Sequence, residues 1–242
     1  MKNYLLKFFI PSIFIISCNS EEKKNMNITG SIDGLKKGTL FLQKISDSLI
    51  KNVDSIEIDG NNKFELGHNI SDSEVYYLYL KKNDGDTLND RIPFFAEKGD
   101  IIINTRLATF ESSAKISGSN NHIIWQEYKD MMRKFDDRNL KIINEYINNK
   151  DNMTDKERLM IFDEETNKLL KRRYLYSLNF SMRNNFSEVS AFIALYEIPN
   201  TNPKYIDSVY NNFTENVKNS VYGNLLKQKL NQENKNWLHV NM

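Results

Sequence analysis

The distribution of glycine divides the sequence into two parts and constrains its fold more than any other feature. Seven of the nine glycines fall at or before Gly99, the next is Gly118, and the last is Gly223. Before residue 118, short runs of alternating apolar and polar residues are separated by turn residues, which is typical of β-strands. After it, apolar residues recur with the period of amphipathic helices. Strands followed by helices indicate an α+β protein with segregated layers.

The first part, residues 26–118, contains eight strand-like runs. Asp59-Gly60-Asn61-Asn62 is a hairpin signal between two of them. Short strands at this regular spacing predict an antiparallel β-sandwich or an open barrel. Tyrosines at 76, 77 and 79 lie on both faces of one strand, so we expect both faces to be partly buried. Gly30 and Gly34 are interpreted as turn glycines. The expected strands are 27–32, 39–45, 50–58, 63–66, 75–80, 92–96, 101–105 and 114–117.

The second part, residues 119–232, has the pattern of a helical region. A polar turn separates an amphipathic segment from the capping box Thr154-Asp155-Lys156-Glu157, so we expect two long antiparallel helices. Proline breaks divide the rest of this part into shorter helices. Residues 233–242 are expected to form a tail, either ordered or frayed. The expected helices are 122–149, 154–182, 187–198, 203–216 and 221–232.

The N-terminus has the features of an export signal that ends in a lipid attachment site. Lys2 and Lys7 accompany an apolar run at 8–16, which is about half of the roughly 20 residues that a spanning helix needs. Ile15-Ile16-Ser17-Cys18 resembles a bacterial lipobox, and Cys18 is the only cysteine. A thiolate is a strong nucleophile that can accept a diacylglyceryl group.

We therefore expect a signal peptide at 1–17, lipid attachment (including palmitate-type chains) at Cys18 and a polar tether at 18–25. The resemblance to bacterial lipoproteins implies a chain held in the cell envelope at the outer membrane. Ser20-Glu21-Glu22 looks like the acidic signal for the cell surface, and a solvated linker is the alternative, so both the periplasmic face and the surface stay open. A single-pass anchor and a secreted protein with a stray cysteine are the other interpretations.

Charge and cysteine content exclude several classes of function. Lys plus Arg is 33 and Asp plus Glu is 32, a net charge of +1, so the chain as a whole has no electrostatic reason to bind nucleic acid. A single cysteine excludes an intramolecular disulfide, a Cys-x-x-Cys pair and a cysteine-built zinc site. We expect no nucleic-acid partner.

Residues that bear reactive or metal-binding groups do not form a recognisable active site. None of His68, His122 and His239 has a second histidine at the spacing of a zinc motif. Asp84, Asp86 and Asp90 alternate as in a calcium loop, but the bidentate glutamate is missing. We therefore expect no metal, no cofactor and no catalytic residue, and a protein that is not an enzyme.

Three further patterns have both a functional and a structural interpretation. Asp54-Ser55 could be a base with a nucleophile, although a hydrogen bond at a strand edge is favoured. On a helix Lys171-Arg172-Arg173 fan around about 200° and form no single patch, which favours a solvated face. Trp125 and Trp237 could stack on a glycan, and a core contact is favoured for each.

Several segments of the first part resemble the domain of unknown function 4369. They are 28–34, 38–42, 53–56, 59–60, 64–67, 94–101 and 116–119. Three later segments, 187–191, 205–206 and 219–223, look like the helical segment that often follows this domain. This family heads lipid-anchored envelope proteins of Bacteroidota, and its chemistry belongs to a thioredoxin-like domain of the TlpA/ResA kind. That domain carries a Cys-x-x-Cys pair, which is absent here.

The resemblance therefore implies a chain with the N-terminal domain and helical segment of such proteins but without their thioredoxin-like redox domain. No catalytic residue carries over. It leaves open whether the chain is a truncated relic of a longer protein. We expect a non-catalytic binding or interaction module, anchored to the membrane by its lipid, and its partner as either an envelope protein or a small envelope ligand. The alternative is an accessory subunit of a separate thioredoxin-like thiol-disulfide oxidoreductase.

Overall fold

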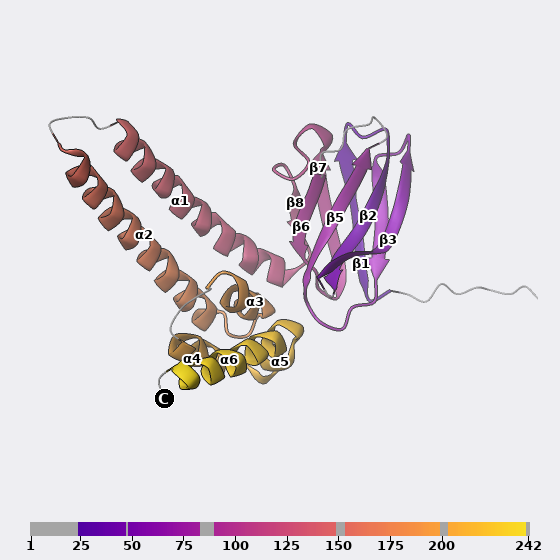
Figure 1. Cartoon of the computed structure of the whole chain (residues 1–242). Helices are drawn as coiled ribbons and strands as arrows, with labels where there is room; N and C mark the ends of the chain where they lie inside the picture. Colours follow the sequence, from indigo (N-terminus) through magenta and orange to yellow (C-terminus); the bar gives the residue numbers. More distant parts are fainter. Residues whose placement is uncertain (1–23, 47, 83–89, 149–152, 199–202, 241–242) are drawn as a thin grey trace, which may run out of the picture.

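Two layers of strands are followed by helices in the computed structural model, which describes residues 24–46, 48–82, 90–148, 153–198 and 203–240 (Figure 1). The strands form two four-stranded sheets, with the orders β4-β1-β7-β8 and β3-β2-β5-β6, so the predicted sandwich is confirmed. The strands are β1 Met26–Asp33, β2 Lys37–Ser46, β3 Leu49–Asp59, β4 Lys63–His68, β5 Val75–Lys82, β6 Asp90–Phe95, β7 Gly99–Arg106 and β8 Lys115–Ser117.

One strand pair departs from the expected antiparallel arrangement. β1 lies beside β7 in parallel, with Met26 opposite Gly99 and Asp33 opposite Arg106, whereas the other described pairs are antiparallel. A parallel pair needs a long crossover, and here the crossover includes the whole of the other sheet. Alternation within a strand reports which face is buried but not which strand lies alongside, so the sequence did not indicate this pairing.

Gly30 was wrongly interpreted as a turn residue, because it lies inside β1. It is opposite Phe64 on β4 and Ile103 on β7. A Cβ atom at this position would lie 1.8 Å from the carbonyl oxygen of Ile103, so only glycine allows the two strands to approach this closely. Gly34, by contrast, follows β1 with a φ of 86°, as expected for a turn glycine.

The sandwich core is built from the inward residues of both sheets. Alternate residues of β1, β2, β5 and β7 are buried, as their apolar periodicity predicts. On β5 the side chain of Tyr76 is fully buried and those of Tyr77 and Tyr79 are half-buried on the other face, so both faces of this strand are partly covered.

Six helices follow in the described part of the chain. α1 and α2 are the predicted antiparallel pair, and the capping box of Thr154 and Glu157 is present at the start of α2. One predicted helix is divided in two because Thr214 caps a new helix after Asn212. α6 continues beyond residue 232. The helices are α1 Asn120–Asn148, α2 Asp155–Arg183, α3 Glu188–Tyr196, α4 Pro203–Asn212, α5 Glu215–Asn219 and α6 Val221–Val240.

The helical region has its own core, which meets the sandwich at β6. Figure 1 shows α1 and α2 running side by side away from the sandwich, with α3 to α6 gathered at their base. Neighbouring residues of β6 face opposite ways: Phe94 belongs to the sandwich core and Phe95 to the helical core. The ring of Phe95 lies edge-on to Trp125, Phe192 and Tyr222, at centroid distances of 5.8, 5.9 and 6.0 Å.

Candidate binding site at the end of the helical hairpin

Polar contacts fix the start of α1 against the sandwich. The carboxylate of Glu97 accepts hydrogen bonds from the Ser119 hydroxyl and the Asn121 N–H, both at 3.1 Å, at the positive end of the helix. His122 Nδ1 accepts the N–H of Phe95 at 3.3 Å. Burial, with a smaller effect of the Lys129 charge, lowers the pKa of His122 to about 4. His122 is therefore a neutral acceptor that joins the two parts.

Contacts along the hairpin hold α2 in register with α1. The hydroxyls of Tyr128 and Ser177 lie 2.8 Å apart in the interior. Arg173 pairs with Asp136 at 2.9 Å on the surface. Toward the far end, the rings of Tyr146 and Phe162 lie 4.8 Å apart. The hairpin is thus a defined arm that presents its outer half away from the sandwich (Figure 1).

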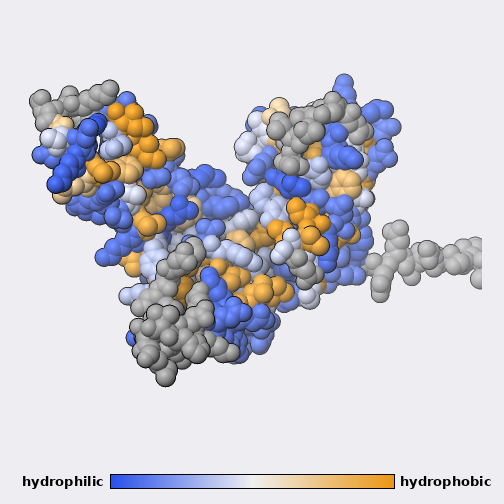
Figure 2. Space-filling view, in the orientation of Figure 1, coloured by the Kyte–Doolittle hydropathy of each residue, from blue (hydrophilic) through white to orange (hydrophobic). Residues whose placement is uncertain are grey.

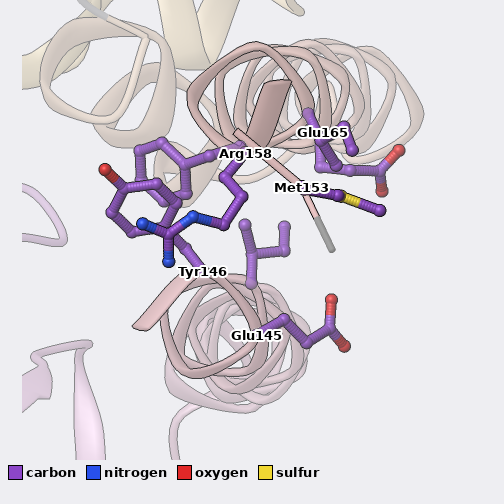
Figure 3. Close-up of a pocket in the computed structure, with 8 residues that line it drawn as sticks. Glu145, Tyr146, Met153, Arg158 and Glu165 are labelled. Carbon is purple, nitrogen blue, oxygen red and sulfur yellow. The ribbon is translucent and has the colours of Figure 1, made fainter. Parts of the chain in front are cut away.

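The outer half of the hairpin contains a pocket of about 170 Å³ between α1 and α2 (Figure 3). Its apolar lining comes from both helices and from Met153, just before α2. Met153 and Ile161 are about half exposed, at 45% and 48%, so the pocket opens to solvent. The lining residues are Ile142, Glu145, Tyr146, Met153, Arg158, Ile161, Phe162 and Glu165.

Charged groups surround this apolar lining. Arg138 lies between the carboxylates of Glu145 and Glu165, at 3.5 and 3.4 Å, and so links the two helices. The hydrogen bond and charge of Lys168, assisted by Arg138, lower the pKa of Glu165. The guanidinium of Arg158 lies 5.8 Å from the centre of the Tyr146 ring. An apolar pocket with a few charged groups at its edge is suited to binding an apolar side chain and orienting what carries it.

Large apolar side chains are exposed around the same half of the hairpin. Figure 2 shows apolar surface near its far end. Four consecutive apolar residues, 159–162, point to all sides of α2, so a two-helix hairpin cannot bury them all. That run is the one signal in the sequence that could have indicated this surface. The residues exposed here include Leu140, Ile147, Leu159 and Met160, at 58%, 57%, 47% and 63%.

Several residues singled out in the sequence for lipid attachment or metal binding fall outside the part of the chain that the structure describes. Cys18, Asp84 and Asp86 lie outside the described residues, as does the side chain of Asp90. No group of three His, Cys, Asp or Glu side chains within the described ranges is placed to hold a metal ion.

Asp54 has the strand-edge role that was favoured for it. Its carboxylate accepts the Ser55 N–H at 2.9 Å, the Gly67 N–H at 2.8 Å and the Lys24 ammonium at 2.8 Å. Partial burial acts to raise the pKa of Asp54, but these hydrogen bonds outweigh it and leave the pKa below its ordinary value. Asp54 is thus engaged by two backbone N–H groups and by Lys24, and its contact with Ser55 is to the backbone N–H.

The positions of Trp125 and of the basic run 171–173 agree with the structural interpretation that was favoured for each. Trp125 is buried in the helical core with the ammonium of Lys129 4.1 Å from its ring centre, whereas the side chain of Trp237 lies outside the described part. Lys171 and Arg172 are exposed and Arg173 is paired across the hairpin, as expected for a solvated face. None of the helices in the described ranges is long and apolar enough to cross a membrane.

Fold and site together define a β-sandwich protein with a projecting helical arm. Residues 26–125 match the family described as Domain of unknown function (DUF4369), so this chain carries that domain. The match runs past β8 to Trp125 and therefore includes the start of α1 that Glu97 and Phe95 hold. No curated protein and no solved structure matches the chain.

Proposed function

We propose that this chain is a lipid-anchored cell-envelope protein that binds a partner protein through the end of its helical hairpin and carries out no catalysis itself. The observation that carries the proposal is the open apolar pocket between α1 and α2, with exposed Met153 and Ile161 at its mouth. Anchoring is supported by the lipobox-like residues before Cys18. The outer membrane is the proposed site of attachment, on its periplasmic or its outer face.

The pocket favours a macromolecular partner over a small metabolite. Its volume of about 170 Å³ accommodates one large side chain, which is small for a metabolite site of several hundred Å³. The exposed apolar residues around it extend the contact surface on both helices. Such a combination suits an amphipathic segment that inserts one apolar residue into a groove.

The anchoring is tested by growing cells with an alkyne-tagged fatty acid. We expect the tag on the natural chain and its loss in Cys18→Ala, because the thiol is the acceptor of the lipid. A natural chain that carries no tag would contradict the anchoring, whatever the outcome of the binding experiment.

The binding is tested by placing a photo-crosslinking amino acid at Met153 in cells and identifying the adducts by mass spectrometry. The matched control is the same amino acid at Ile123, which is 59% exposed at the opposite end of α1. We expect an adduct specific to position 153 that Ile161→Ser weakens and Ile123→Ser does not.

Equal adducts from the two positions would contradict a site at the hairpin end. An adduct with a thioredoxin-like protein that carries a Cys-x-x-Cys pair would support the alternative, an accessory subunit of a separate oxidoreductase.

A further inference from the structure

We propose that the β2–β3 hairpin end contacts the membrane surface and sets the orientation of the sandwich on it. The hairpin end is defined by Ile45, Leu49 and Ile50, whose side chains are 51%, 64% and 53% exposed. Ile45 is directly opposite Ile50 in the ladder, and Leu49 is opposite Ser46. Ile45 and Ile50 therefore lie on one face of the hairpin end and Leu49 on the other, so aliphatic side chains are exposed on both faces. The inference depends on the proposed lipid anchoring.

The chain leaves the sandwich near this hairpin. Lys24, two residues before β1, donates its ammonium to Asp54 of β3 at 2.8 Å. Ile50 precedes Asp54 by four residues on the same strand, which is about 13 Å at roughly 3.3 Å per residue. The hydrogen bonds from Ser55 and Gly67 fix the Asp54 carboxylate, so the exit point of the tether is fixed as well.

The tether is short enough to bring the hairpin end to the bilayer. Only five residues, 19–23, separate the lipid attachment point at Cys18 from Lys24. The six residue steps from Cys18 to Lys24 span at most about 20 Å when fully extended. The membrane surface must then lie within that distance of Lys24, which is comparable to the distance from Asp54 to the hairpin end. The lipid anchor thus brings these side chains close to a bilayer, which is an apolar environment that they can enter.

The chemistry of the hairpin end matches a membrane interface. Lys44 and Lys51 form the cross-strand pair directly behind Ile45 and Ile50. Aliphatic side chains at a tip with ammonium groups behind them can enter the acyl boundary while the cations stay at the headgroups. Anionic lipids would add to this attraction. Lys44 also pairs with Glu74 at 3.5 Å, so Lys51 is the more exposed cation.

A second copy of the chain is a less suitable occupant. A stable protein interface takes about 20–30 residues from each side. Three side chains at a turn fall far short of that area. They are sufficient as an orienting contact for a chain that its lipid already holds at the surface.

The test uses the full lipidated chain in vesicles of phosphatidylcholine and phosphatidylglycerol. In this chain Cys18 carries the lipid, so Leu49→Cys supplies the free thiol for an environment-sensitive nitrobenzoxadiazole label. The matched control is Asn61→Cys, in the turn at the other end of β3. With doxyl-labelled phosphatidylcholine in the bilayer, we expect a blue-shifted emission at position 49 and a quenching several times that at position 61.

Equal quenching at the two positions, in protein that floats with the vesicles, would overturn the membrane contact and leave the anchoring intact. A blue-shifted label at position 49 that doxyl lipids do not quench would show that a protein surface covers the hairpin end, which also overturns the contact. Labelling of the unsubstituted chain would show a free Cys18 thiol, and the anchoring and this inference would then both be wrong.

Discussion

His122 shows how one buried side chain links the two parts of the molecule. As a neutral ring it accepts the N–H of Phe95, the last residue of β6, and so satisfies a backbone donor at the sheet edge. The same burial makes the charged ring unfavourable and lowers its pKa to about 4. The role of His122 could not be read from the sequence, because its partner lies 27 residues earlier on a strand.

We predict that the free energy of unfolding depends on pH through His122. Its pKa is about 4 in the folded chain and 6.5 for the free side chain. Above pH 6.5 the His122 ring is neutral in both the folded and the unfolded chain, and its contribution to the free energy of unfolding is fully present. As the pH falls toward 4, only the unfolded state takes up the proton, so stability is lost, on the order of 3 kcal/mol.

Chemical denaturation of the natural chain and of His122→Asn between these pH values checks this prediction. Asparagine has an acceptor oxygen in a similar place but does not titrate. We expect the stability of the natural chain to fall more steeply with acid than that of the variant. Parallel curves would mean that other groups cause the acid sensitivity.

At the scale of elements, the sequence predicted those helix starts and turns that depend on residues close together in the chain. The capping box at Thr154 and the turn at Gly60 involve residues within a few positions, and both lie where the sequence placed them. The pairing of β1 with β7 and the pocket between α1 and α2 depend on which distant residues come opposite each other. Glu145 and Glu165 meet through Arg138 only once the register of the hairpin is set.

We predict that Gly30→Ala strongly destabilises the sandwich. The new methyl would lie 1.8 Å from the Ile103 carbonyl oxygen, so β1 and β7 must move apart. The expected cost is at least about 2 kcal/mol, as for other overpacked interiors. Thermal and urea unfolding measure it.

The matched control is Gly60→Ala, because Gly60 has a φ of 85° and nothing within 4 Å of an added Cβ. It should lose only about 1 kcal/mol from backbone strain. The close approach of β1 and β7 would be contradicted if Gly30→Ala were no more costly than this control.

At the scale of the whole molecule, two cores share one strand. Phe94 contacts Tyr76 within the sandwich, with ring centres 6.3 Å apart, and Phe95 enters the aromatic cluster of the helical region. The Tyr222 hydroxyl accepts the N–H of Val75 at 2.9 Å, so α6 is attached to the same sheet. The apolar pair at 94–95 indicated a buried strand in the sequence, but not that its two faces belong to different cores.

This arrangement predicts that Phe95→Ala uncouples the helices from the sandwich. Truncating either buried phenylalanine should cost about 3–5 kcal/mol. Phe94→Ala removes that contribution from the sandwich core, whereas Phe95→Ala removes it from the contact between β6 and the helices. Hydrogen exchange with mass spectrometry, followed across urea concentrations, separates the two effects. In Phe95→Ala we expect α3 and α6 to lose protection at lower urea than β1, β2 and β5, and in Phe94→Ala the strands to lose protection first.

If both variants lost protection in the same order, Phe95 would not be the link, and contacts such as that of Tyr222 with Val75 would have to hold the two parts together.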